Sequence, residues 1–195
     1  SGKGAWLFTD EKKRYLDFAS GIAVSCLGHS NPILVKALRS QSEKLWHTSN
    51  LYNIKEQERL AQELCNKSFA DKVFFCNSGA EATEGLIKLA RKYHHVKGDF
   101  LKKDIIVLDN AFHGRTITGV QAGSSSLHKE GFLAKEDCSC GFTRVPLGNI
   151  EYLKKKINAN TAAIFFEPIQ GEGGINVCPK NYLKPVSYTH LTLPT

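Results

Sequence analysis

The stretch from Val73 to Tyr93 changes abruptly from the pattern of a strand to the pattern of a helix. Residues Val73 to Cys76 (VFFC) are apolar throughout and rich in β-branched and aromatic side chains, which predicts a buried interior strand. From Ala82 on, apolar residues recur at helical spacing. Asn77-Ser78-Gly79 must therefore form a tight connection from a strand into a helix.

The start of this predicted helix carries the signals of an N-terminus. Ser78 stands three residues before Glu81, the spacing of a capping box in which the carboxylate returns to the amide of Ser78. Gly79 allows other groups to approach the backbone closely. Two interpretations stay open: a well-capped structural helix, or a site at which the free first-turn amides of Ser78, Gly79 and Ala80 bind a phosphate.

Three runs are predicted as strands because they are apolar throughout: residues 73–76, 105–108 and 162–166. Strands of this kind, separated by helical segments, predict a parallel sheet that helices cover on both faces, which is an α/β fold.

The N-terminal part has a different pattern. Residues 5–8 and 14–18 flank a polar turn at residues 10–13 and predict a hairpin. Asn31-Pro32 is the start signal of a helix that we expect to run to about residue 46. A second helix is predicted near residues 56–67.

Polar residues follow the ends of the three predicted strands. Ligands of parallel sheets bind beyond the carboxyl ends of the strands, so these segments should meet at one rim. They are Ser78-Gly79-Ala80, Phe112-His113-Gly114-Arg115, and residues 167–174 with Glu167, Gln170 and Glu172. This rim would suit a flat, charged, phosphorylated ligand. It would combine an anion-binding turn with an aromatic ring, an imidazole, a guanidinium and two carboxylates. Neither a Walker loop nor a Rossmann fingerprint is present.

Composition argues against other classes of function. The formal net charge is +7, but the basic residues are dispersed, which does not favour nucleic-acid binding. Cys138-Ser139-Cys140 has no second Cys or His pair at zinc-finger spacing, so no metal site is predicted. The scattered cysteines fit a reducing compartment.

No apolar stretch has the length of a membrane span, and no partnership with a membrane is expected.

Five segments together carry a resemblance to a known family. The combination resembles the class III (fold type I) pyridoxal-phosphate-dependent aminotransferases, in family order and up to about residue 184. The segments are GIAVSCLGH (21–29), KLWHTSNLY (44–52), FFCNSGAEATEGLIKLARK (74–92), AFHGRT (111–116) and EPIQGEGG (167–174).

The resemblance implies roles for individual residues. Ser78, Gly79 and Ala80 would bind the phosphate of pyridoxal 5'-phosphate, and Phe112 would stack on its pyridine ring, with His113 and Glu167 in the same cofactor-binding set. Arg115 would bind a substrate carboxylate. Glu172 would pair with a later arginine.

The resemblance also implies a reaction, the transfer of an amino group from a small-molecule donor to 2-oxoglutarate. Residues 112–115 and 47–50 favour N-acetylornithine as the donor, a step of arginine biosynthesis. Ornithine, succinyl-diaminopimelate and 4-aminobutyrate remain alternatives, as does a non-catalytic relative that only binds the cofactor. A homodimer in the cytoplasm, or in the mitochondrion of a eukaryote, is expected.

The sequence is further expected to be the N-terminal half of such an enzyme. In the family, the lysine that carries the cofactor and the aspartate that faces the pyridine nitrogen follow EPIQGEGG, so no catalytic residue is assigned and this fragment alone should be inactive. We predict a hairpin and helix segment at 1–53, part of the large cofactor-binding domain at 54–184, and a non-native tail at 185–195.

Overall fold

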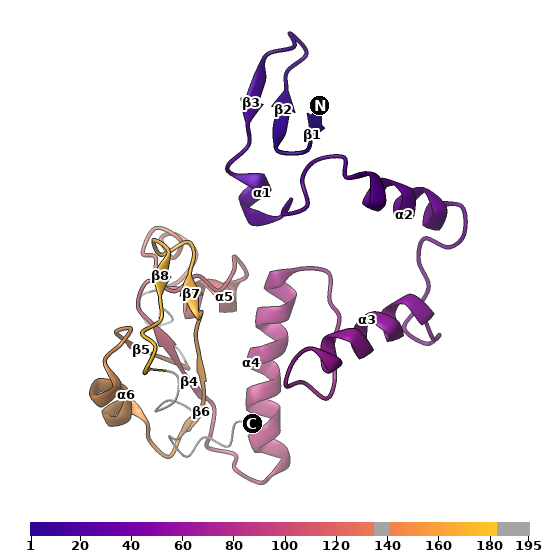
Figure 1. Cartoon of the computed structure of the whole chain (residues 1–195). Coiled ribbons are helices and arrows are strands. Elements are labelled where there is room, and N and C mark those ends of the chain that lie inside the picture. Colours follow the sequence, from indigo (N-terminus) through magenta and orange to yellow (C-terminus); the bar gives the residue numbers. More distant parts are fainter. Residues whose placement is uncertain (135–140, 183–195) are drawn as a thin grey trace. The chain divides into compact units, whose positions relative to one another are not determined.

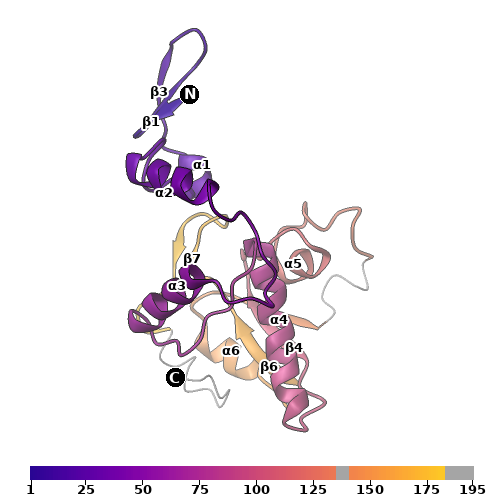
Figure 2. The same ribbon diagram turned by 90° about the vertical axis from the view of Figure 1, so that its right-hand side faces the viewer.

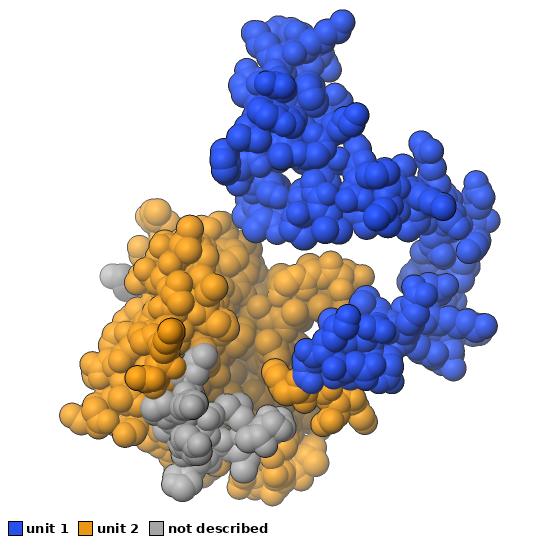
Figure 3. Space-filling view, viewed as in Figure 1, with its two compact units in different colours: residues 1–68 blue, residues 69–195 orange. Residues whose placement is uncertain are grey.

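The computed structural model describes residues 1–134 and 141–182. The chain forms two compact units, residues 1–68 and the part from Phe69 on, which are described separately (Figure 3). The predicted boundaries at 53/54 and 184/185 remain predictions, and the predicted tail at 185–195 and Cys138-Ser139-Cys140 lie outside the described residues. No helix in the described ranges is both long and apolar enough to cross a membrane.

The first unit begins with a small antiparallel sheet in the order β1-β2-β3 (Figure 1). Its strands are β1 (Gly2–Lys3), β2 (Trp6–Phe8) and β3 (Arg14–Leu16). The pairing of β2 with β3 confirms the predicted hairpin.

Three helical segments follow in the same unit: α1 (Ser20–Ala23), α2 (Pro32–Ser42) and α3 (Lys55–Asn66). The Asn31 side chain accepts a hydrogen bond from the amide of Ile33 at 3.0 Å, so the predicted cap of α2 is confirmed. The helix ends earlier than the predicted residue 46. The Ser42 hydroxyl donates to the carbonyl oxygen of Arg39, a local bond that competes with continued helix.

The second unit contains the predicted parallel sheet, in the order β5-β4-β6. Its elements are α4 (Gly79–Val96), β4 (Asp104–Leu108), α5 (Ile117–Ala122), β5 (Phe142–Val145), α6 (Ile150–Lys156), β6 (Thr161–Phe165), β7 (Ile169–Gln170) and β8 (Asn176–Val177). The strands predicted at 105–108 and 162–166 are found within one residue at each end.

The central strand β4 is buried on both faces because its alternate side chains enter two separate clusters. Ile105 and Val107 pack with Ile87 of α4, whereas Ile106 and Leu108 pack with residues on the side of α6. Figures 1 and 2 show the sheet with α4 and α6 in this arrangement. The predicted cover of helices on both faces is therefore confirmed.

The strand predicted at 73–76 is wrong for this structure. The segment is not part of a strand, and Phe74 is 83% exposed. Its composition matches that of β4, but no strand among the described residues offers it a backbone partner. A strand is stabilised by its cross-strand neighbours more than by intrinsic propensity. Residues 104–108 have neighbouring strands on both sides and form a strand, whereas residues 73–76 have a similar apolar pattern but no neighbouring strand among the described residues.

Strand β5 was not predicted because Thr143 and Arg144 interrupt its apolar pattern. The Arg144 guanidinium donates to the carbonyl oxygens of Gln121 and Ala122 at the end of α5. The Arg144 side chain therefore provides hydrogen-bond donors for the last carbonyl groups of α5. Its charge does not prevent β5 from pairing with β4.

Candidate active site

The start of α4 is held by its side chains. The Ser78 hydroxyl accepts a hydrogen bond from the amide of Glu81 at 3.2 Å, as predicted. The second half of the predicted capping box differs, because the Glu81 carboxylate accepts from the amide of Asn77 and not from that of Ser78. Ser78 is extended, with φ −155°, and the amide that faces the carboxylate is that of the preceding residue.

Two backbone amides at this helix start have no partner. Within the described ranges, the amides of Gly79 and Ala80 donate to no acceptor. A Cβ atom built on Gly79 would meet nothing within 4 Å, so neither packing nor a positive φ requires glycine here. Free amides beside an open position at a helix N-terminus fit the phosphate of a cofactor.

The direction of α4 brings this helix start to the carboxyl end of the sheet. At its beginning, Ala80 lies against Gly114, in the segment after β4, with 3.6 Å between the Ala80 Cα and a Cβ built on Gly114. Near its other end, the ring of His94 lies 2.9 Å (Nε2) from the carbonyl oxygen of Ala162, at the beginning of β6. The free amides therefore lie at the rim at which ligands of parallel sheets bind.

A hollow of about 590 Å³ adjoins the start of α4, a volume typical of sites for small ligands. Ser78, Ala80 and Thr116 are among the residues that line it. Thr116 was not predicted as a site residue. Its place directly after Arg115, in the segment AFHGRT, was the available signal.

The segments that follow β4 and β6 are joined to each other. The amide of Phe112 donates to the Glu167 carboxylate at 3.0 Å. The Gln170 side-chain amide is 1% exposed and donates to the carbonyl oxygen of Asp109 at 2.7 Å. Two bonds from side chains of one loop to the backbone of the other fix the position of Phe112 relative to Glu167.

Gly173 also holds these loops close together. A Cβ atom at this position would overlap the carbonyl oxygen of Asn110. We therefore expect Gly173→Ala to lower the free energy of unfolding by about 1 to 3 kcal/mol, because backbone must move to relieve the overlap. Urea denaturation measures the change, with Gly171→Ala as the control, since a Cβ there would meet nothing within 4 Å. Equal stability of the two variants would contradict the close packing.

Arg115 and Phe112 lie together on this rim. The guanidinium carbon of Arg115 is 5.6 Å from the centroid of the Phe112 ring, a cation–π contact. Phe112 is half-buried and Arg115 is exposed. Arg115 forms no ion pair with any carboxylate of the described residues, so its donors are available to a ligand.

His113 points the other way, into the core. Its ring is 4% exposed and stacks on Phe165, with centroids 4.1 Å apart. Burial, and then the nearby Arg144 charge, lower the pKa of His113 from 6.5 to about 4, so the ring is neutral at neutral pH. The structure thus places the ring beneath the rim, and its predicted contact with the cofactor stays a prediction.

The low pKa of His113 makes stability depend on pH. Between about pH 4 and 6.5, His113 is protonated in the unfolded state but stays neutral in the folded state. The free energy of unfolding therefore falls as the pH falls through this window. From pH 7 to pH 5 we expect a loss of about 2 kcal/mol from this group. Urea denaturation of the parent and of His113→Phe, which keeps a ring for stacking, measures it. Identical pH dependence of both proteins would contradict the assignment.

Some of the predicted site residues are connected by contacts in the described part of the structure, and others are not. Ala80, Phe112, Arg115 and Glu167 are connected through the contacts above. Glu172 is exposed and has no ion pair or hydrogen bond to another described residue, so its predicted pairing with an arginine stays a prediction.

The fold and this rim define an α/β protein whose ligand site lies at the carboxyl ends of parallel strands, with a helix N-terminus free to bind an anion. Residues 1–189 match the family described as Aminotransferase class-III, and the chain belongs to this family.

Several curated relatives are similar over most of this chain. The sequence is 52% identical to acetylornithine aminotransferase of Agrobacterium fabrum over 183 residues, which cover 94% of this chain and 45% of that relative. It is 53% identical, with the same coverage of both chains, to acetylornithine aminotransferase of Mesorhizobium japonicum. The chain thus spans about half the length of the curated relatives it matches.

Solved structures confirm the fold type I architecture. N-acetylornithine aminotransferase from Stenotrophomonas maltophilia matches with a TM-score of 0.78 and 37% identity, over 95% of this chain and 45% of that one. Ornithine aminotransferase from Toxoplasma gondii matches with a TM-score of 0.86 and 30% identity, over 95% of this chain and 44% of that one. A second structure of the Toxoplasma enzyme is described with PLP at its active site.

Proposed function

We propose that this chain is the cofactor-binding part of an aminotransferase that transfers the terminal amino group of N-acetylornithine to 2-oxoglutarate, a step of arginine biosynthesis. The observation that carries the proposal is the start of α4, where Gly79 and Ala80 present two free amides and Ala80 lies against Gly114, in the segment that carries Phe112 and Arg115. The similarity to acetylornithine aminotransferases at about half identity supports this choice of donor.

The residues present fit pyridoxal 5'-phosphate. The amides of Gly79 and Ala80 and the Ser78 hydroxyl would hold its phosphate, and the Phe112 ring would lie against its pyridine ring. When bound, the cofactor supplies an electron sink for the negative charge that develops on the substrate. The Glu167 carboxylate accepts a hydrogen bond from the backbone amide of Phe112, and so holds the backbone from which the aromatic ring projects.

Arg115 would orient the substrate. N-acetylornithine and 2-oxoglutarate both carry carboxylates, and a guanidinium can bind a carboxylate with two parallel hydrogen bonds. Because the Arg115 side chain has no carboxylate partner within the described part of the chain, substrate binding does not have to break an existing ion pair.

A homodimer in the cytoplasm is part of the proposal. Apolar residues on α4 and just before it support a covering partner surface, since Leu89 is 65% exposed, Val96 72% and Phe74 83%.

A panel of amino donors tests the proposed reaction. With 2-oxoglutarate as acceptor, the full-length protein should show a kcat/KM for N-acetylornithine about tenfold or more above that for ornithine, succinyl-diaminopimelate or 4-aminobutyrate. A higher value for another donor would reassign the substrate. If the protein bound the cofactor but formed no glutamate from any donor, it would be a non-catalytic relative.

A further inference from the structure

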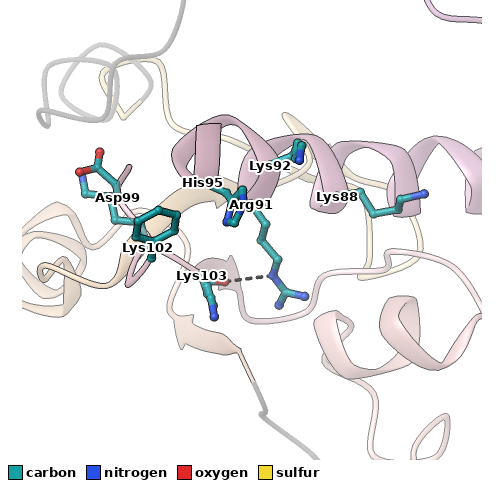
Figure 4. Close-up of a pocket in the computed structure, with 8 residues that line it drawn as sticks. Lys88, Arg91, Lys92, His95, Asp99, Lys102 and Lys103 are labelled. Carbon is teal, nitrogen blue, oxygen red and sulfur yellow. Dashed lines mark hydrogen bonds between the residues drawn. The ribbon is translucent and has the colours of Figure 1, made fainter. Parts of the chain in front are cut away.

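A second hollow lies along the C-terminal half of α4, and it shares Lys88 with the hollow at the start of this helix. The last turns of the helix and the turn before β4 enclose a groove of about 500 Å³ (Figure 4). Five basic side chains line it: Lys88, Arg91, Lys92, Lys102 and Lys103. Among the described residues that line it, Asp99 is the one acidic side chain, so these five basic residues and Asp99 carry a formal charge of +4.

The positive charge of this groove is not neutralised by ion pairs with the described residues. None of the five basic residues forms an ion pair within the described ranges of the chain. The negative end of the α4 dipole favours basic residues in its last turns, which is an ordinary structural reason for some of them. It does not account for Lys102 and Lys103, which a different segment brings to the same groove.

Arg91 is the most firmly placed of these side chains. Its Nε donates to the carbonyl oxygen of Lys103 at 3.1 Å, as the dashed line in Figure 4 shows. Its guanidinium carbon lies 5.7 Å from the centroid of the Phe142 ring, and Arg91 is only half-exposed. A guanidinium held in this way loses little conformational freedom when its remaining N–H groups bind an anion.

An exposed aromatic ring stands among these charges. Phe100 is 59% exposed and packs edge to face against His95, with ring centroids 5.1 Å apart. The ring is therefore supported from one side and open to a ligand. Aromatic side chains of this kind stack on nucleobases, whereas basic side chains bind phosphates.

We propose that the groove binds a nucleoside phosphate, whose base stacks on Phe100 and whose phosphates contact Arg91 and the lysines around it. The volume suits a single small ligand. Arg91 stands twelve residues after Gly79 on α4, roughly 18 Å at 1.5 Å per residue, so phosphates bound at Arg91 leave the amides of Gly79 and Ala80 free. This site does not depend on the aminotransferase function proposed above.

Isothermal titration of the full-length protein with ATP, tripolyphosphate and adenosine tests the proposal. ATP should bind more tightly than either tripolyphosphate or adenosine, and more weakly at higher ionic strength. The double variant Lys92→Gln/Lys102→Gln should weaken ATP binding by about ten- to a hundredfold. Phe100→Leu should weaken the binding of ATP but not of tripolyphosphate.

The matched control removes two lysines from the end of another helix, Lys154→Gln/Lys155→Gln on α6, and should leave ATP affinity within about twofold of the parent. Equal losses in the two double variants would show a general effect of net charge and overturn the site. Unchanged affinity of Lys92→Gln/Lys102→Gln would overturn it as well. Affinity that rises with the length of a single-stranded oligonucleotide would replace the proposal with a nucleic-acid surface.

Discussion

Arg115→Ala in the full-length enzyme is expected to lower kcat/KM for N-acetylornithine by about ten- to a hundredfold. A guanidinium that binds a carboxylate makes charge-assisted hydrogen bonds, and the loss of about 1.5 to 3 kcal/mol of such bonding corresponds to this range. The exposed Arg115 side chain, 5.6 Å from the Phe112 ring, can offer such bonds to a substrate on the rim. Steady-state kinetics over a range of donor concentrations measures the loss.

Two further measurements separate substrate binding by Arg115 from a structural role. Arg115→Lys should recover only part of the loss, because an ammonium group cannot bind a carboxylate with two parallel hydrogen bonds. Cofactor content of Arg115→Ala should stay near that of the parent, since Gly79 and Ala80 hold the phosphate. Parental kcat/KM, or joint loss of activity and cofactor, would contradict the role of Arg115.

Gly79→Val is expected to speed release of pyridoxal phosphate by about tenfold or more. A Cβ atom at position 79 would meet nothing within 4 Å, so we expect the fold to tolerate valine there. It would, however, occupy the space through which a phosphate approaches the two free amides. Dialysis followed by measurement of bound cofactor reports this directly and does not depend on activity.

Leu86→Val is the control for this change, because it introduces a valine at an exposed position of the same helix that does not line the hollow. It should release the cofactor at the parental rate. If Gly79→Val and Leu86→Val retained the cofactor equally well, the Ser78 turn would be a helix cap and nothing more.

Much of the fold could be predicted because local signals and tertiary context agree. The strand β4 and the cap at Asn31 were predicted from composition and spacing, and both are present. Residues 73–76 have an equally strong strand pattern but no partner strand in the described chain. Pairing is a tertiary property, and periodicity alone cannot supply it.

The sequence was enough to predict which loops form the candidate site. It was not enough to predict in which direction each side chain of these loops points. Phe112 and His113 are consecutive and were predicted together, yet Phe112 lies on the rim and His113 is buried against Phe165. The interlocking of the loops through Gln170 and Gly173 depends on residues distant in sequence. No pattern within one segment contains such contacts.

The central claim is that the turn at Ser78, where α4 begins, binds the phosphate of the cofactor. A crystal structure of the full-length protein grown with pyridoxal phosphate tests it most directly. The account predicts phosphate oxygens within hydrogen-bond distance of the amides of Gly79 and Ala80, with the Phe112 ring against the pyridine ring. A phosphate bound elsewhere, with the amides of Gly79 and Ala80 facing only solvent, would contradict it.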